Sequence, residues 1–194
     1  MTVVDEKKAL RTRMLQQRNE LDMISYREHC NEIYEKVKNL SELKRAMRVH
    51  TYVSSIANEI DTLGLLYHLF DEGKTVIVPK CGPGKRELRH LRIRSLNELK
   101  PGGFGLMEPE YQPENEMKPA ALDIVIVPMV AYDRKGLRLG MGGGYYDTFL
   151  SDVTCTTVGL AYSFQELDAL PHEDHDSKLD IIINEKEIIR VSHE

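Results

Sequence analysis

The chain has 194 residues, a length that favours one domain spanning residues 1–194. Apolar side chains make up 41 % of the sequence, which is enough to build a buried core and excludes a disordered chain. The 26 Lys and Arg against 31 Asp and Glu give a net charge of −5, which argues against a general nucleic-acid binder.

Two helices are predicted before any strand. Residues 5–21 place Leu10, Met14 and Leu21 on one apolar stripe, as an amphipathic helix does. A second helix is expected to begin at residues 25–28, where Ser-Tyr-Arg-Glu has the form of a capping box. The expected inner face of this second helix consists of Tyr26, Cys30, Ile33, Val37 and Leu40.

Beyond Arg48 the pattern changes to short runs rich in β-branched residues, which are typical of strands. Such runs occupy residues 49–53, 75–78, 88–93, 124–127, 157–161, 181–183 and 188–191, and helical patterns fall at 62–70, 145–150 and 164–170. The almost continuous apolar run at 123–127 indicates a strand buried on both faces. The alternation therefore predicts a three-layer α/β fold with a mostly parallel sheet flanked by helices. The 88–93 run carries cations between its apolar residues and is expected at an edge or in an antiparallel position.

Three widely spaced cysteines, Cys30, Cys81 and Cys155, form no CxxC pattern, so we expect buried free thiols in a reducing compartment. The N-terminus has no apolar signal segment, and the apolar stretch at 124–132 is too short to span a membrane. These features predict a cytoplasmic protein that binds no membrane.

The sequence Arg138-Leu-Gly-Met-Gly-Gly-Gly-Tyr-Tyr-Asp147 leads four glycines into a helical pattern. Glycines let a backbone approach a ligand closely, and a helix start offers free N–H groups to an anion. The pattern is neither a Walker A loop nor GxGxxG, because no Gly-Lys-Ser/Thr follows and Tyr145 replaces the last glycine. Phosphate binding and a tight turn both remain open on this pattern alone.

The first predicted helix also carries a cationic strip. At 100° per residue, Lys7, Arg11 and Arg18 fall within about 40° of one another, beside the apolar stripe. Cations that border a buried face can extend along it into a cleft. The alternative is that they are the solvated flank of an amphipathic helix.

Together these motifs resemble the 5-formyltetrahydrofolate cyclo-ligase family, the 5,10-methenyltetrahydrofolate synthetases. The resemblance rests first on residues 138–147, preceded by Val127-Pro128 and Ala131-Tyr132-Asp133. Further segments agree in order along nearly the whole chain: Lys7-x-x-x-Arg11 with Arg18, Glu59-Ile60-x-Thr62, Val78-Pro79-Lys80, Gly105-Leu106-x-Glu108-Pro109, Leu170-Pro171, His175-Asp176 and Asp180.

The resemblance implies an ATP- and Mg²⁺-dependent closure of 5-formyltetrahydrofolate to 5,10-methenyltetrahydrofolate, with release of ADP and phosphate. The formyl oxygen would accept the γ-phosphoryl group, and N10 would then attack the activated carbon. Such a transfer requires positioning and charge neutralisation more than a nucleophilic side chain. The implied fold is that of sugar-phosphate isomerases and CoA-transferases.

The same resemblance assigns the nucleotide site. Lys7 and Arg11 would hold ATP phosphates, and Arg138 with the glycine backbone would bind the transferred group. Lys7, Arg138 and Tyr145 are the expected catalytic residues, and Asp147 would hold Mg²⁺ directly or through water. The expected ATP-binding residues are Lys7, Arg11, Arg138, Gly140, Gly142, Gly143, Gly144, Tyr145, Tyr146 and Asp147.

For the folate, Tyr145 and Tyr146 would line the joint between nucleotide and substrate. Glu59 would accept hydrogen bonds from the N–H edge of the pterin, and Phe104 would stack on the flat pterin ring. The expected partners are therefore 5-formyltetrahydrofolate and ATP, with no nucleic acid and no membrane, in a monomer or weak homodimer.

Two segments depart from the family pattern. Some family members carry a further cation inside the glycine cluster, where Met141 and Gly143 stand here, so the charge must come from the other cations, with Lys80 as a further candidate. The basic segment 81–93 matches no family pattern. It is either a solvated edge hairpin or a contact for a polyglutamate tail.

Other residues leave alternatives open. The histidines His172, His175 and His193 form no metal-binding spacing with the cysteines, and His175 is expected to be a hydrogen-bonded structural residue. Asp133 is either a loop anchor or a residue near the metal. The competing function is a catalytically weak protein that binds folate or nucleotide without turnover.

Overall fold

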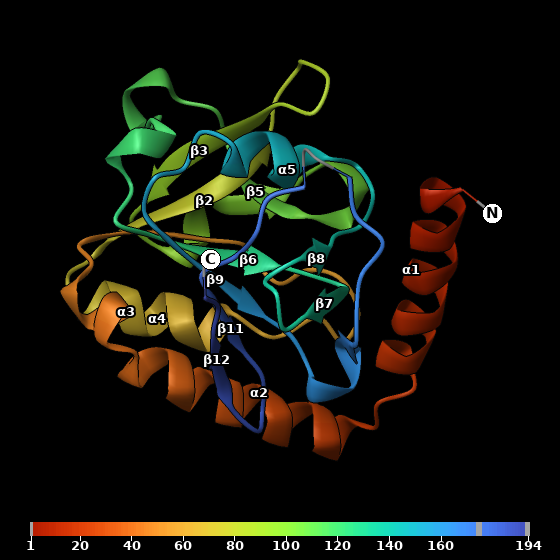
Figure 1. Ribbon diagram of the computed structural model, residues 1–194. Coiled ribbons are helices and arrows are strands. Elements are labelled where there is room, and N and C mark those ends of the chain that lie inside the picture. Colours follow the sequence, from red (N-terminus) through yellow and green to blue (C-terminus); the bar gives the residue numbers. More distant parts are fainter. Residues whose placement is uncertain (1, 174–175, 193–194) are drawn as a thin grey trace.

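The computed structural model describes residues 2–173 and 176–192. Its centre is a seven-stranded sheet in the order β12-β11-β9-β6-β1-β2-β3 (Figure 1). The five inner strands are parallel, and the two edge strands, β3 and β12, pair antiparallel with their neighbours. The strands are β1 (Arg48–Thr51), β2 (Thr75–Cys81), β3 (Leu88–Ile93), β6 (Ile124–Pro128), β9 (Thr156–Leu160), β11 (Ile181–Ile183) and β12 (Ile188–Arg190). The predicted mostly parallel α/β sheet and the edge position of the 88–93 strand are confirmed.

The central strand β6 shows why the sheet is buried on both faces. Ile124 and Ile126 belong to one apolar cluster, whereas Val125 and Val127 belong to another, because successive side chains point to opposite faces. The helices that cover the first cluster are α2 (Met23–Asn39), α3 (Ser41–Arg45) and α4 (Leu63–Asp71), below the sheet in Figure 1. The short helix α5 (Tyr145–Leu150) contributes Phe149 and Leu150 to the second cluster.

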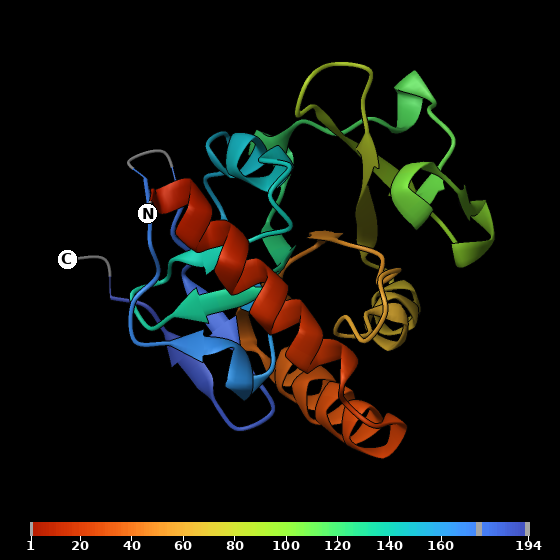
Figure 2. The same ribbon diagram turned by 90° about the vertical axis from the view of Figure 1, so that its right-hand side faces the viewer.

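A smaller sheet and the first helix complete the fold. The order of this sheet is β10-β7-β8, formed by Glu166–Leu167, Ala131–Asp133 and Arg138–Leu139. Helix α1 (Val3–Asn19) lies across β7 and β8 (Figure 2). Leu10 and Met14 pack there against residues of the small sheet, as predicted. Leu21, the third residue of the predicted stripe, lies beyond the end of α1 and packs instead against the first apolar cluster. The remaining short elements, which the sequence pattern does not reveal, are β4 (Leu99–Pro101), β5 (Met107–Pro109) and the 3₁₀ turns Leu96–Glu98, Gly103–Gly105, Pro113–Asn115, Pro119–Ala121 and Ser163–Gln165.

The predicted start of the second helix is wrong. Helix α2 begins at Met23, and its N-cap is Asp22, whose Oδ1 accepts hydrogen bonds from the Ile24 and Ser25 amides at 2.9 and 3.0 Å. Ser25 instead donates its hydroxyl to Asp22 at 2.7 Å. The carboxylate satisfies the free N–H groups three residues before the expected cap.

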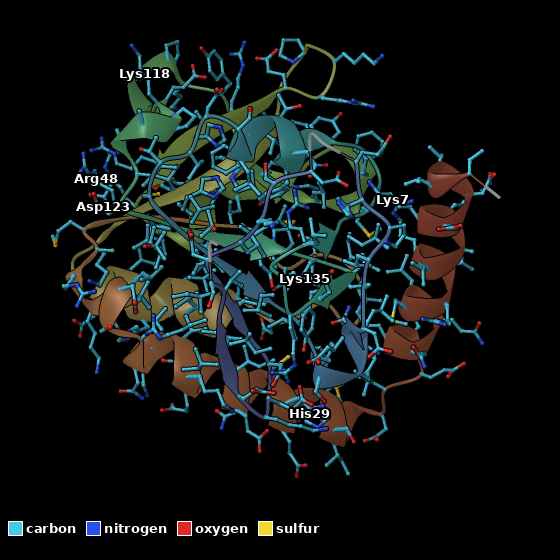
Figure 3. The ribbon with its side chains drawn as sticks, in the orientation of Figure 1. Lys7, His29, Arg48, Lys118, Asp123 and Lys135 are labelled. Atoms are coloured by element: carbon cyan, nitrogen blue, oxygen red, sulfur yellow. The ribbon has the colours of Figure 1, made fainter. Side chains whose placement is uncertain are left out.

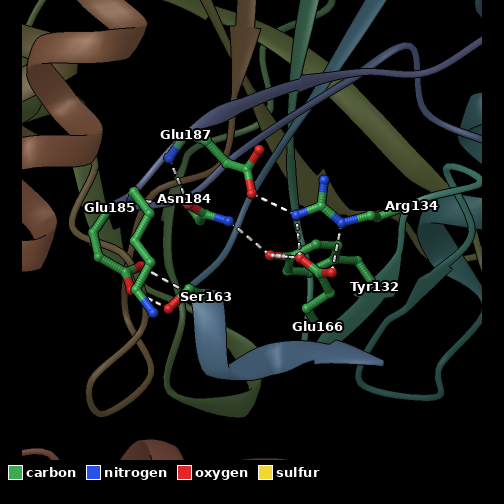
Figure 4. A network of polar contacts seen from close by, with 8 residues as sticks. Tyr132, Arg134, Ser163, Glu166, Asn184, Glu185 and Glu187 are labelled. Carbon is green, nitrogen blue, oxygen red and sulfur yellow. Dashed lines mark hydrogen bonds and ion pairs between the residues drawn. The ribbon is translucent and has the colours of Figure 1, made fainter. Parts of the chain in front are cut away.

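The predicted helix at 164–170 is also wrong. The segment forms a 3₁₀ turn followed by β10, because its side chains bond to distant parts of the chain. Gln165 donates to the Val130 carbonyl at 2.6 Å, and Glu166 accepts from Arg134 at 2.7 Å (Figure 4). These long-range contacts outweigh a weak local helical preference.

All three cysteines are free thiols, as expected, but the expected burial holds for Cys30 alone, because Cys81 and Cys155 are half-buried. Within residues 2–173 and 176–192, no helix combines the length and the apolar character needed to cross a membrane.

Asp133 is a loop anchor. It is 1 % exposed, its Oδ1 accepts from the Lys135 and Leu137 amides, and its Oδ2 accepts from the Leu170 amide at 3.1 Å. Both oxygens are therefore used to hold the turn between β7 and β8 against the 167–170 segment.

We expect Asp133→Asn to lower the free energy of unfolding by about 2 kcal/mol, because the amide nitrogen must face a backbone donor in a buried place. Urea denaturation measures the effect. The matched control is Asp168→Asn, at an exposed position nearby, which should leave stability within about 0.5 kcal/mol of wild type. Equal stability of the two variants would show that the Asp133 contacts are dispensable.

Candidate functional site

The glycine loop, residues 140–144, connects β8 to α5. Gly142 has φ of +96° and Gly144 has φ of +72°, in the left-handed region that favours glycine. A Cβ on Gly142 would lie 3.1 Å from the guanidinium carbon of Arg11. Glycine at these positions thus permits the left-handed backbone, and at Gly142 it also leaves room for the Arg11 side chain.

Arg138 lies beneath this loop, and its side chain is 2 % exposed. Its Nη2 donates to Asp147 Oδ1 at 2.7 Å, and its guanidinium lies 5.8 Å from the ring centre of Tyr146. Its Nε is buried and has no hydrogen-bond partner within the described part of the chain. A buried donor without a partner is costly, so this atom is suited to bind a ligand.

Arg11 approaches the same loop from α1. Its Nε donates to the Gly140 carbonyl at 2.7 Å. Burial lowers the pKa of Arg11, and the charge of Asp147 opposes this effect. Burial likewise lowers the pKa of Arg138, again opposed by Asp147. Asp147 therefore acts on both desolvated guanidinium groups, and Asp176 has a smaller effect of the same sign on Arg138.

Lys7 projects from α1 toward the segment that follows Leu170 (Figure 3). Its Nζ lies 2.6 Å from Asp176 Oδ2 and 3.1 Å from Glu173 Oε2. Burial opposes its charge, but these two carboxylates outweigh burial and raise the pKa of Lys7. Binding of a phosphate by Lys7 would require exchange of these partners, so its assigned role stays a prediction.

The two tyrosines of α5 face different surroundings. A Cβ on Gly143 would lie 2.8 Å from the ring of Tyr145, so this ring covers the glycine loop. The hydroxyl of Tyr146 is buried and has no partner among the described residues. Burial first, and then the charge of Glu59, raise the pKa of Tyr146, so its hydroxyl keeps its proton.

Glu59 belongs to the Glu59 loop, residues 54–61, which follows β1. Its Oε2 accepts a hydrogen bond from the Ser55 amide at 3.3 Å. Burial raises the pKa of Glu59, against the effects of this amide and of the Arg18 charge. The charge of Glu59 also raises the pKa of Tyr146, so the two side chains lie within electrostatic range of each other.

Arg18 is a candidate residue to which the sequence analysis assigned no role of its own. It is 2 % exposed, and its Nε and Nη2 atoms are buried without hydrogen-bond partners in the described chain. The Asn58 side chain donates to the Arg18 carbonyl at 2.9 Å, which ties the Glu59 loop to α1. The cationic strip of α1 therefore faces inward rather than solvent, and the helical spacing with Lys7 and Arg11 was the signal.

Phe104 is not packed against the other candidates. Its side chain is 85 % exposed, at the turn between β4 and β5. The ribbon of these two strands is nevertheless joined to the Glu59 loop, because the Met107 amide donates to Ser55 Oγ at 3.2 Å. Lys80, the further candidate cation, is paired with Glu108 at 3.4 Å. The stacking role of Phe104 stays a prediction.

Asp147 is the residue expected to hold Mg²⁺. Within residues 2–173 and 176–192, no group of three or more His, Cys, Asp or Glu side chains is placed to hold a metal ion. A single carboxylate fits Mg²⁺ that arrives bound to nucleotide phosphates, because Mg²⁺ commonly takes one or two carboxylates beside phosphate oxygens.

Among the three histidines considered in the sequence, His172 places its Nδ1 atom 3.4 Å from the Leu170 carbonyl oxygen. His175 and His193 lie outside the described residues.

A mostly parallel α/β sheet carries here a glycine loop beside buried arginines, an arrangement suited to phosphate groups. Residues 3–185 match the sequence profile of the 5-formyltetrahydrofolate cyclo-ligase family. The chain belongs to this family and is a cyclo-ligase of folate metabolism.

Three relatives illustrate the match. The 5-formyltetrahydrofolate cyclo-ligase of Haemophilus influenzae is 33 % identical over 92 % of this chain and 97 % of its own length. The enzyme of that name from Saccharomyces cerevisiae is 30 % identical over 91 % of this chain and 94 % of its own. The solved structure of Aquifex aeolicus 5,10-methenyltetrahydrofolate synthetase is 34 % identical, with a TM-score of 0.85, over 97 % of this chain and 94 % of that one.

We expect Glu59→Gln to raise stability at neutral pH, because it removes a carboxylate whose charge burial disfavours. The raised pKa means that the native state holds this proton more tightly than the unfolded chain. Wild type therefore loses stability as pH rises from the unfolded to the folded pKa of Glu59. The advantage of the variant is full above the folded pKa and vanishes below the unfolded one.

Urea midpoints measured across this pH range test the expectation, with Glu114→Gln as the control at an exposed position. A lower midpoint for Glu59→Gln than for wild type at neutral pH would show that the charged carboxylate stabilises the fold.

Proposed function

We propose that the chain closes 5-formyltetrahydrofolate to 5,10-methenyltetrahydrofolate at the expense of ATP, with Mg²⁺ as cofactor. The observation that carries this proposal is the convergence of Arg11 and Arg138 on the glycine loop, with the Arg138 Nε buried and unpartnered among the described residues. Such an arrangement suits the negative charge of a phosphoryl group in transfer. The identity of the folate substrate is inferred from the names of the relatives.

In the first step the formyl oxygen attacks the γ-phosphorus of ATP, and ADP leaves. Arg11 and Arg138 neutralise charge on the transferred group, and the backbone of the glycine loop orients it. Asp147 would hold Mg²⁺ together with the phosphates, and the ion would supply further charge neutralisation there. Lys7 contributes a third cation when phosphate replaces its carboxylate partners.

In the second step N10 attacks the activated formyl carbon, the carbon–oxygen bond breaks, and phosphate departs as N10 loses its proton. Glu59 holds the pterin by accepting hydrogen bonds from its adjacent N–H groups. Tyr145 and Tyr146 separate the nucleotide from the folate, and the Tyr146 hydroxyl remains a donor because its pKa is raised. Phe104 stacks on the ring from the exposed side.

The proposed unit is the whole chain, as one domain, in a cytoplasmic monomer or weak homodimer that acts on these two small molecules. A catalytically weak binding protein is the alternative, and it would bind either ligand without forming ADP.

The central test mixes the protein with Mg-ATP and 5-formyltetrahydrofolate and follows methenyl absorbance and ADP together. We expect one ADP per methenyl product and no product without nucleotide. Arg11→Met should raise KM for ATP about tenfold, since it removes a charged contact to phosphate. Arg13→Met, an exposed cation on the same helix, should change KM less than about twofold.

Product formed without nucleotide would overturn the proposal, and ligand binding without ADP would favour the binding protein. Equal KM values in the two arginine variants would remove Arg11 from the nucleotide site.

A second test concerns Glu59. Glu59→Gln places an amide donor against the pterin donors, so affinity for 5-methyltetrahydrofolate, which has no formyl oxygen to phosphorylate, should fall at least about tenfold. Affinity for a non-hydrolysable ATP analogue should be unchanged. Calorimetric titration measures both, with Glu114→Gln as control. Wild-type folate affinity in Glu59→Gln would exclude the proposed substrate orientation.

A further inference from the structure

The hairpin between β2 and β3 lies beside the start of α5, although the two segments are far apart in sequence (Figures 1 and 2). Residues 82–87 form its turn. Glu87 shapes this turn, because its carbonyl accepts from the Gly82 amide and its Oε2 from the Gly84 amide, both at 2.9 Å. The other oxygen of Glu87 accepts from Arg89 at 3.0 Å. The carboxylate nearest to the turn is therefore already engaged.

Arg86 extends from this turn onto the glycine loop. A Cβ on Gly144 would lie 2.9 Å from Arg86 Nε and 3.2 Å from its guanidinium carbon, so the guanidinium lies directly over this glycine. Arg86 forms no ion pair and no hydrogen bond with any residue in 2–173 or 176–192. Its positive charge is thus placed at the loop without an ion-paired carboxylate among the described residues.

Three glycines of the loop, Gly140, Gly142 and Gly144, each lie against a different arginine side chain. Atoms of the Arg138 and Arg11 guanidinium groups lie 3.1 Å from Cβ positions built on Gly140 and Gly142 respectively, and Arg86 occupies the same relation to Gly144. The three side chains come from β8, from α1 and from the hairpin. Asp147 is the one carboxylate that forms an ion pair with any of them within the described chain, through Arg138.

The three arginines and Asp147 together carry a net positive charge, and one of the arginines also has an unpaired buried donor. Arg138 Nε is buried with no partner in the described residues, which makes it a donor suited to a bound ligand. The loop itself supplies no cation, since Met141 and Gly143 stand between the other glycines. Three guanidinium groups along one short loop match an extended anion with several charges better than a single phosphate.

We propose that Arg86 is a phosphate-binding residue, the third arginine of a site that extends along the glycine loop and takes the polyphosphate chain of a nucleotide. The proposal rests on the proposed function and deepens it. It also assigns a role to the basic hairpin, which supplies from outside the loop the charge that the loop lacks.

The test measures affinity for inorganic tripolyphosphate and for a non-hydrolysable ATP analogue by calorimetry. Arg86→Met should lower both affinities at least about tenfold, and Arg86→Lys should restore part of the loss because it keeps the charge without the planar fork. The matched control is Lys85→Met, which removes an exposed cation from the same turn and should change affinity less than about twofold. Thermal unfolding of each variant verifies the fold.

The outcomes separate this inference from the proposed function. If Arg86→Met binds tripolyphosphate and the ATP analogue as tightly as wild type, the inference is overturned whatever the turnover. If tripolyphosphate binding depends on Arg86 but wild type forms no ADP from 5-formyltetrahydrofolate, the inference stands and the cyclo-ligase mechanism fails. A wild type that binds neither tripolyphosphate nor the ATP analogue overturns both.

Discussion

The seating of α1 on the small sheet is the contact on which the candidate site depends. Leu10 and Met14 enter the apolar cluster that also contains Leu139, and this docking fixes the rotation of the helix about its own axis. Because helical side chains a turn apart share a face, the same rotation carries Arg11 to the glycine loop and Arg18 to the interior. Apolar contacts that fold the N-terminus thereby assemble the charged part of the site.

The site works against the stability of the fold that holds it. Arg18 and Arg138 keep buried nitrogen atoms without partners in the described chain, and Glu59 is a carboxylate whose charge burial disfavours. Each of these groups costs free energy of folding unless a ligand completes it. The apolar clusters on both faces of the sheet offset this cost, since β6 is closed to solvent along most of its length. Polar groups that pack poorly by themselves are the expected signature of a binding site.

The parallel sheet was predictable because strands such as 124–127 carry their own signal, an apolar run too short for a helix. The inward strip of α1 was predictable for a similar reason, since helical spacing relates Arg11 to the apolar stripe. The helix expected at 164–170 failed because Gln165 and Glu166 bond to distant residues that no local pattern reveals. The contact of Arg86 with the glycine loop belongs to this second kind, because it depends on the order of strands in the sheet.

The hydrogen bond from Arg11 to the Gly140 carbonyl joins α1 directly to the glycine loop. A ligand that contacts both is then thermodynamically linked to the local opening of the helix, because the open form cannot bind it. At a ligand concentration one hundred times Kd, this linkage raises the free energy of opening by about 2.7 kcal/mol. Amide hydrogens of α1 that exchange through this opening would exchange about a hundredfold more slowly in the complex. Amide exchange in the N-terminal helix would therefore report whether the site is occupied.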